Sequence, residues 1–170
     1  MKKSTKNLVI GAVIAALYAS LTLVGNIAGL SYGRIQFRIS EALTVLPIFT
    51  PAAIPGLAVG CFISNIASFN PIDMIFGTIA TLCAAFLSYY ARNLCIKKIP
   101  VISLLSPVFF NALVVGAEIS LFLSEGTVTA IGFLTCAALV GLGELAVCLA
   151  LGLPLMFTVR HNKILSNMLE

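Results

Sequence analysis

Residues 32–56 read YGRIQFRISEALTVLPIFTPAAIPG, and the three charged side chains in this stretch, Arg34, Arg38 and Glu41, stand between two long uncharged runs. The run that precedes Arg34 has 27 residues, and the run that follows Glu41 has 31. Since about 18 consecutive apolar residues are enough to cross a bilayer, both runs predict membrane-spanning helices. Arg34 and Arg38 are then expected to lie in the loop between two spans, and Glu41 in the first turn of the second span.

The composition of the whole chain agrees with a membrane protein. Of its 170 residues, 60% are hydrophobic and only 9% are charged, and the mean hydropathy is +1.10. Charged residues supply about a quarter of an ordinary soluble domain. We therefore expect an all-α membrane protein in which residues 1–170 form a single integral membrane domain.

The N-terminus has two interpretations. Lys2, Lys3 and Lys6 precede a long apolar run, as in a cleavable signal peptide. Such signals have a shorter apolar core and a small-residue cleavage site, whereas this run continues to Leu30. An uncleaved first span is the better interpretation.

Turn residues and charges divide the chain into six helical segments. The second is short because Pro47, Pro51 and Pro55 interrupt any helix in that region. The sixth is long enough to tilt in the bilayer. The expected ranges are about 8–24, 40 to 47 or 51, 55–69, 73–91, 101–123 and 128–159.

A six-transmembrane-helix bundle places both termini on one side of the membrane. With the N-terminus inside, eight Lys and Arg residues are cytoplasmic, and only Arg34 and Arg38 are outside. This bias fits the positive-inside rule, so both termini are predicted to be cytoplasmic.

Polarity alternates from Arg34 to Ser40, with Gln36 and Arg38 on the polar side. A period of two indicates an extended segment, which could lie across the outer mouth of the bundle with its polar groups toward a ligand. The alternative is structural: Arg38 and Glu41 form an interfacial ion pair, and the helix dipole favours Glu41.

Two carboxylates fall inside predicted spans, Glu118 and Glu144. A charge at bilayer depth costs about 2.5–3.5 kcal/mol, so it normally faces a partner or a cavity. Asn111 lies two helical turns before Glu118 on the same face. Together with Asn26, Asn65, Asn70 and Asp73 these groups predict an outward-opening polar pocket; a proton relay or a hydrogen-bond clamp between helices is the alternative.

Aromatic side chains suited to stacking on a planar ligand are present, although each also fits ordinary packing or an interfacial position. They are Tyr18, Tyr32, Phe37, Phe69 and Phe110.

Metal binding and catalysis find little support. The five cysteines are scattered without a CxxC spacing, and the one histidine, His161, lies in the basic tail. Because no HExxH or GxSxG motif is present, we expect neither an enzyme nor a metal or other cofactor.

Small residues line one side of the first segment. Gly11, Ala15 and Ala19 share one stripe, and Ala12, Ala16 and Ser20 share the next. Small residues at every fourth position let helices approach closely in lipid. The contact could be internal, or it could be a docking face for another membrane subunit.

These features resemble the substrate-binding S component of an energy-coupling factor (ECF) transporter. More narrowly, IQFRISEALTVLPIFTPAAIPGLAVGCFISNI (35–66) and FNPIDMIFGTIAT (69–81) resemble the QueT family, proposed importers of queuosine precursors. The resemblance extends over nearly the whole chain. It implies that this chain binds a micronutrient from outside with high affinity. A transmembrane T component and two cytoplasmic ATP-binding subunits would then drive its reorientation in the membrane.

The sequence agrees with that division of labour, because it holds no GxxxxGK[ST] phosphate loop. ATP hydrolysis would reside in the partner subunits. Carried over from the family, the contact with the T component would fall on Ala12, Ala15, Ala16 and Ala19.

The implied cargo is queuine or a 7-deazaguanine precursor base, and its chemistry can be compared with the candidate pocket. A guanine-like edge offers adjacent N–H donors that a carboxylate accepts, and a carbonyl that needs a donor. Glu118 or Glu144 could take the first role, and Asn111, Gln36 or Arg38 the second. An aminomethyl cation would add a use for Glu41 or Asp73.

A stand-alone secondary or proton-coupled carrier for a small polar solute, using Glu118 and Glu144, is the alternative function. It would need no ATP-binding subunits.

Overall fold

The computed structural model describes residues 2–29, 37–66, 71–123 and 129–169. This part of the chain is all-helical; an isolated bridge between Ile96 and Ile99 is its one β-type pairing. In chain order the elements are α1 (Lys3–Ile27), η1 (Ile39–Ile48), α2 (Ala53–Ile66), α3 (Pro71–Tyr90), η2 (Ala91–Asn93), α4 (Val101–Leu123), α5 (Ala130–Val147), η3 (Cys148–Gly152), α6 (Leu153–His161) and α7 (Lys163–Leu169). The all-α prediction is confirmed.

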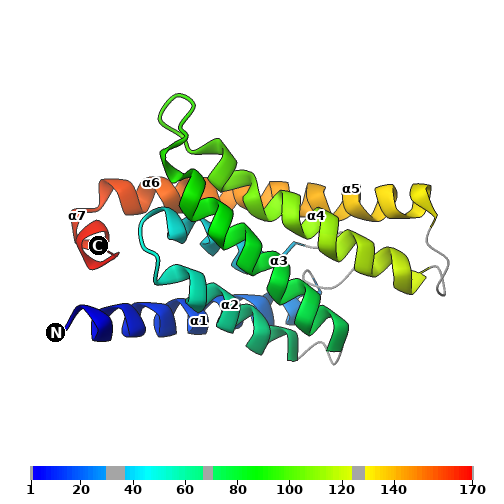
Figure 1. Ribbon diagram of the computed structural model, residues 1–170, viewed down its shortest axis with the longest axis horizontal. Coiled ribbons are helices and arrows are strands. Elements are labelled where there is room, and N and C mark those ends of the chain that lie inside the picture. Colours follow the sequence, from blue (N-terminus) through cyan, green and yellow to red (C-terminus); the bar gives the residue numbers. More distant parts are fainter. Residues whose placement is uncertain (1, 30–36, 67–70, 124–128, 170) are drawn as a thin grey trace.

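The long helices lie side by side along the long axis of the molecule (Figure 1). Each packs against the next in chain order: α1 on α2, α2 on α3, α3 on α4 and α4 on α5. Both ends of the chain lie at the same end of the bundle (Figure 1). The opposite end is formed by the end of α4 and the start of α5 (Figure 1).

The short segment η1 is the centre of the bundle. All eight residues from Ser40 to Pro47 are buried, and η1 contacts α1, α2, α3, α4, α5, η3 and α6. It is a 3-10 helix of 10 residues, longer than such helices usually run. Thr44 contributes to the tight winding, since its hydroxyl donates to the carbonyl of Glu41 at 2.6 Å.

Four of the described helical stretches are long and apolar enough to cross a membrane: 3–27, 72–93, 101–121 and 130–161. The other two apolar helices, η1 and α2, have 10 and 14 residues. Each is about 20 Å long, shorter than a hydrocarbon core of about 30 Å. The six predicted segments are all helical, but the count of six spans is not confirmed and stays a prediction.

The outward-facing side chains of the bundle are mainly large and apolar. Exposed Leu, Ile, Val and Phe side chains occur on α1, α2, α3, α4 and α5. A soluble monomer rarely exposes such continuous apolar surface. The distribution is that of a protein whose solvent is lipid.

The helices α1 and α2 approach closely at small residues. A methyl group added at Gly56 would lie 2.6 Å from the carbonyl oxygen of Gly11, and one at Gly60 would lie 2.7 Å from that of Ala15. All three members of the stripe, Gly11, Ala15 and Ala19, are buried, and α2 covers Gly11 and Ala15. Ala12, Ala16 and Ser20 on the next stripe are exposed.

The sequence predicts one unbroken helix over residues 128–159, but the structure interrupts the helix in this region. Five π-helical residues, η3, separate α5 from α6, and Pro154 follows at the start of α6. Proline cannot donate a backbone hydrogen bond and crowds the preceding turn, so a local π-type widening relieves it.

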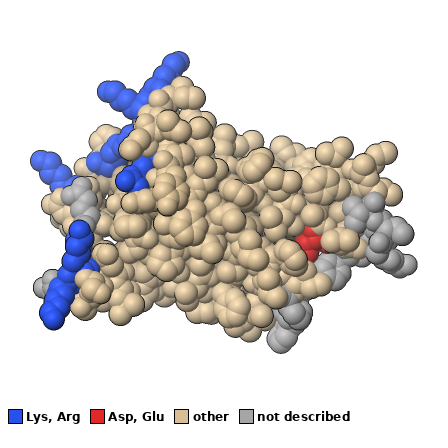
Figure 2. Space-filling model, viewed as in Figure 1, with Lys and Arg blue, Asp and Glu red and all other residues tan. Residues whose placement is uncertain are grey.

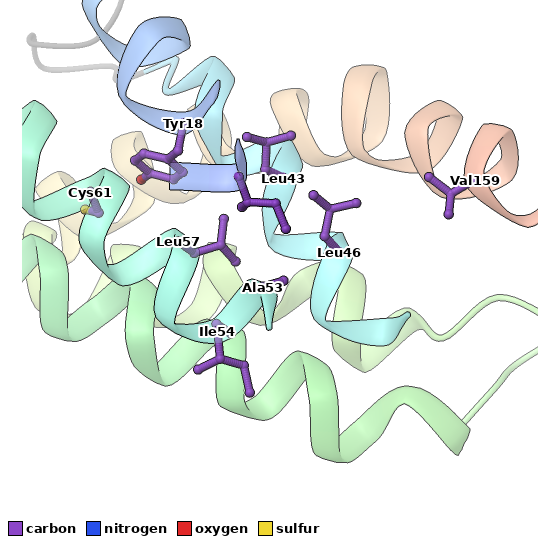
Figure 3. Packing of buried hydrophobic residues seen from close by; sticks show 10 residues of the cluster. Tyr18, Leu43, Leu46, Ala53, Ile54, Leu57, Cys61 and Val159 are labelled. Atoms are coloured by element: carbon purple, nitrogen blue, oxygen red, sulfur yellow. The ribbon is translucent and has the colours of Figure 1, made fainter. Parts of the chain in front are cut away.

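An apolar cluster fills the bundle between α1, η1, α2 and α6. Leu43 and Leu46 of η1 lie between Leu57 of α2 on one side and Val159 of α6 on the other (Figure 3). Tyr18 of α1 borders this cluster, and its hydroxyl leads into the polar region described below.

Lysine and arginine side chains gather at the end that holds both termini (Figure 2). They come from the start of α1, the turn between α3 and α4, and α6 with α7 (Figure 1). At that turn Lys97 and Lys98 both adopt positive φ, 49° and 68°. Ile96 and Ile99 pair on either side of them, with N–O distances of 2.9 and 3.0 Å.

Candidate functional site

Buried polar side chains from all the long helices meet around the start of η1. We call Arg38, Glu41, Asn111 and Glu144 the polar centre. None of the four is more than 2% exposed. They come from the N-terminal end of η1, from α4 and from α5, and they are supported by Tyr18 of α1, Asn65 of α2, and Asp73 and Thr81 of α3.

Arg38 is held by α3. Its Nη2 donates to Oδ1 of Asp73 at 3.1 Å, and both side chains are buried. The amide of Asn65 donates to the backbone carbonyl of Asp73 at 3.1 Å. Space for this group comes from Gly77, where an added Cβ would lie 2.8 Å from Asn65 Nδ2 and 3.0 Å from Asp73 Oδ1. The ion pair therefore links η1 to α3 and fixes the guanidinium.

Glu41 is held by hydroxyl groups from two helices. The hydroxyls of Tyr18 and Thr81 both donate to Oε1, the latter at 3.0 Å. These two donors stabilise the carboxylate and set its rotamer. The other oxygen, Oε2, is buried and has no hydrogen-bond partner.

Glu144 is held by one amide. Nδ2 of Asn111 donates to its Oε1 at 3.1 Å, and both side chains are fully buried. Close packing of α4 on α5 permits this, because a Cβ at Gly116 would lie 2.7 Å from Cα of Ala137. Gly141 likewise faces Ala112 of α4.

The polar centre retains unused hydrogen-bonding capacity. Four of its buried atoms have no hydrogen-bond partner among the residues that the structure describes: Arg38 Nη1, Glu41 Oε2, Asn111 Oδ1 and Glu144 Oε2. They belong to one neighbourhood, since Glu144 interacts electrostatically with Glu41 and Arg38, and Asn111 lies close to Glu41. Buried polar atoms are normally paired, because an unpaired one costs about 1–3 kcal/mol. Such a set is suited to bind a small polar molecule.

Glu118 lies in different surroundings. It is buried at the wall of a cavity of about 730 Å³ between α3 and α4, whose other lining residues are apolar: Ile72, Phe76, Phe110, Leu113, Val114, Ala117 and Leu121. Asn111 and Glu118 share a face of α4 as predicted, but Asn111 binds Glu144. The described contacts divide the predicted pocket into a polar centre and an apolar cavity.

The chain as a whole was compared with known proteins. The model of a family described as QueT transporter matches residues 8–161. The chain belongs to the QueT transporter family. It is 45% identical over 83 residues to the queuosine precursor transporter QueT of Lactococcus lactis subsp. cremoris (strain MG1363); this covers 48% of the chain and 49% of that relative. The matched stretch thus spans about half the length of the relative, and no solved structure matches.

Membership in the QueT transporter family and the apolar helices identify a multi-pass protein of the cell membrane. Buried charges are costly in a membrane protein and normally face a partner or a cavity. The buried acids of the polar centre are therefore candidates for a functional role.

The predicted site residues have different outcomes in the structure. Arg38, Asn111, Glu41 and Glu144 come together, with Asp73 paired to Arg38. The alternative prediction of an ion pair between Arg38 and Glu41 is wrong, since Arg38 forms its ion pair with Asp73. Four predicted site residues lie outside the described residues: Tyr32, Arg34, Gln36 and Asn70. The predicted extended segment from Arg34 to Ser40 is therefore described only from Phe37 onward.

The small-residue prediction divides between its two stripes. Ala15 and Ala19 are both buried within the chain, and the backbone of Ala15 lies against Gly60 of α2. Ala12 and Ala16 are exposed. Only these two retain a surface that another subunit could reach in this structure.

Several residues that position the site were missed by sequence reasoning. Tyr18 was considered only for stacking or packing, yet its hydroxyl binds Glu41. Thr81 and Gly77 were not singled out for the site, although Thr81 donates to Glu41 and Gly77 leaves space for the ion pair. Asn65, which was predicted to belong to the pocket, donates to the backbone of Asp73. No local pattern marks a threonine or glycine in an apolar helix as part of a site.

Proposed function

We propose that the chain is the substrate-binding membrane subunit of an ATP-driven, ECF-type importer, and that its cargo is a queuosine precursor. The family and the Lactococcus lactis relative, a queuosine precursor transporter, support the cargo. The binding residues are those of the polar centre. In the membrane the six helical segments would form six spans, with both termini and the basic end in the cytoplasm.

The observation that carries the proposal is the set of four unpartnered atoms in the polar centre. Three are acceptors, on Glu41, Asn111 and Glu144, and one is the Nη1 donor of Arg38. A guanine-like base offers adjacent N–H donors and one carbonyl acceptor, which is the complementary set. Charge-assisted bonds to the carboxylates would be the strongest of these contacts.

Binding by the purified chain tests the substrate part of the proposal. Calorimetric titration with queuine and its deazaguanine precursors should give saturable binding, with guanine and common vitamins as comparison ligands. Glu144→Gln should weaken affinity by about 1.5–3 kcal/mol, because a charged acceptor becomes an amide. Affinity unchanged in both Glu144→Gln and Glu41→Gln would place the site elsewhere.

The partner subunits form the second part of the proposal. The exposed stripe of Ala12, Ala16 and Ser20 on α1 would contact the T component, since small residues let helices approach closely in lipid. Ala15 and Ala19 would contribute by holding α1 against α2.

Substitution of the exposed stripe tests that contact. Ala16→Leu should abolish ATP-dependent uptake and co-purification of the T component while ligand binding persists. Leu17→Ala, at an exposed position beside the stripe, is the matched control and should keep uptake. ATP-independent uptake by the purified chain in vesicles would contradict the proposal and favour a stand-alone carrier.

A further inference from the structure

The polar centre has more buried negative than positive groups. Among the described residues the buried acids are Glu41, Asp73, Glu118 and Glu144, and the one buried cation is Arg38. Arg38 is already paired with Asp73 at 3.1 Å. Glu41 and Glu144 lie in the same neighbourhood, and within the described part of the chain neither carboxyl group forms a salt bridge.

The two carboxyl groups are also similarly arranged. Each uses Oε1 for bonds to the protein, from Tyr18 and Thr81 in one case and from Asn111 in the other. Each leaves Oε2 buried and unpartnered. Two carboxylates close together in a low-dielectric site repel, so the unliganded pair is costly to keep ionised.

A ligand that brings a cation would relieve this cost. Removing a carboxylate from water costs several kcal/mol, and only a good partner charge with further hydrogen bonds repays it. The four unpartnered atoms of the polar centre are three acceptors and one donor, so they complement a ligand rich in N–H groups. A protonated primary or secondary amine supplies both the charge and the donors.

Building on the proposed function, we infer that the polar centre is a site for a cationic base, in which one of Glu41 and Glu144 binds the guanine-like N–H edge and the other binds a protonated amine on the side arm. The site then selects among related bases by charge. Bases that carry an aminomethyl-type arm bind tightly, and those with a neutral arm bind weakly.

Two bases of similar size that share the same guanine-like N–H edge test this selectivity. The probes are 7-aminomethyl-7-deazaguanine, which is protonated at neutral pH, and 7-cyano-7-deazaguanine, which is neutral. Calorimetric titration of the full-length chain in detergent should give about 10- to 100-fold tighter binding of the aminomethyl base, the range expected for one charge-assisted contact. Equal binding, or tighter binding of the cyano base, would overturn the inference.

Substitutions identify the acid that carries the selectivity. Of Glu41→Gln and Glu144→Gln, one should bring the affinity ratio of the two bases close to one, and the other should weaken both bases alike. Thr135→Val, on an exposed part of α5, is the control and should keep the wild-type ratio. A ratio that survives in both Gln variants would contradict the assignment to these acids.

The outcomes separate this inference from the proposed function. If neither base binds the wild-type chain, the proposed function itself fails. If both bind with equal affinity, the function stands and the charge selectivity fails. Unfolding temperatures of the unliganded variants show whether a lost ratio reflects lost folding, and the affinity for the neutral base provides a second internal control.

Discussion

At the scale of single residues, the contacts of Arg38 explain why a chain so apolar keeps a charge at the start of its central helix. Its guanidinium is almost completely buried and binds Asp73, which in turn is fixed by Asn65. A buried ion pair adds little net stability, but breaking it leaves an uncompensated charge. The pair therefore acts as a link that positions η1 on α3.

Asp73→Asn tests that link. It should lower the free energy of unfolding by about 3–5 kcal/mol, because Arg38 would remain charged and buried without its partner. Thermal unfolding in detergent measures the effect. The double variant Arg38→Met with Asp73→Leu should recover much of the loss, since both charges are then absent; a single variant as stable as the wild type would contradict the role of the pair.

At the scale of elements, the close approach of α1 to α2 sets the position of Tyr18. A Cβ added at Gly60 would lie 2.7 Å from the carbonyl oxygen of Ala15 and 2.8 Å from Cβ of Tyr18. The packing of two apolar helices is therefore coupled to the hydroxyl that binds Glu41.

Gly60→Ala should lower the free energy of unfolding by about 1–3 kcal/mol through overpacking. It should also weaken ligand binding, because the contact at Tyr18 must shift. Gly152→Ala is the matched control: its added Cβ would meet nothing nearer than 3.5 Å. Equal unfolding temperatures for the two variants, measured side by side, would contradict the packing account.

The turn between α3 and α4 offers an independent test at the same scale. Lys97 and Lys98 have positive φ, a conformation that costs a residue with a Cβ about 1–2 kcal/mol. Two-residue turns of this kind favour Asn followed by Gly.

Replacing Lys97 by Asn and Lys98 by Gly should therefore raise the unfolding temperature. Lys98→Ala keeps the Cβ and should give no gain. If the Asn-Gly variant unfolds at the wild-type temperature or below it, the turn carries no strain of this origin.

Elements were easier to predict from the sequence than contacts. Long uncharged runs and prolines marked all six helical segments, because hydropathy and helix breaking are local properties. The pairing of Arg38 with Asp73, 35 positions away, and of Asn111 with Glu144, 33 positions away, depends on how helices pack. Arg38 was a plausible local partner for Glu41, but in the packed bundle Glu41 accepts hydrogen bonds from Tyr18 and Thr81.

At the scale of the whole molecule, the prediction to test is that six helical segments cross the membrane. The helices η1 and α2 are each shorter than a bilayer core, yet η1 is surrounded by the other helices and need not contact lipid. In a six-span bundle, the turn between η1 and α2 would face the same side as the termini.

Cysteine labelling distinguishes the arrangements. In a background without the native cysteines, Pro51→Cys, at an exposed position of that turn, should react with a membrane-impermeant maleimide from the cytoplasmic side. Restoring only Cys95, which is exposed in the basic turn, provides the control for that side. Labelling of residue 51 from the outer side alone would rule out six spans.

The most direct measurement is an experimental structure of the chain with 7-aminomethyl-7-deazaguanine bound. The account predicts the base within hydrogen-bond distance of Glu41 Oε2, Glu144 Oε2 and Asn111 Oδ1, with its carbonyl near Arg38 Nη1. A base bound instead in the apolar cavity between α3 and α4, with the polar centre unchanged, would contradict it.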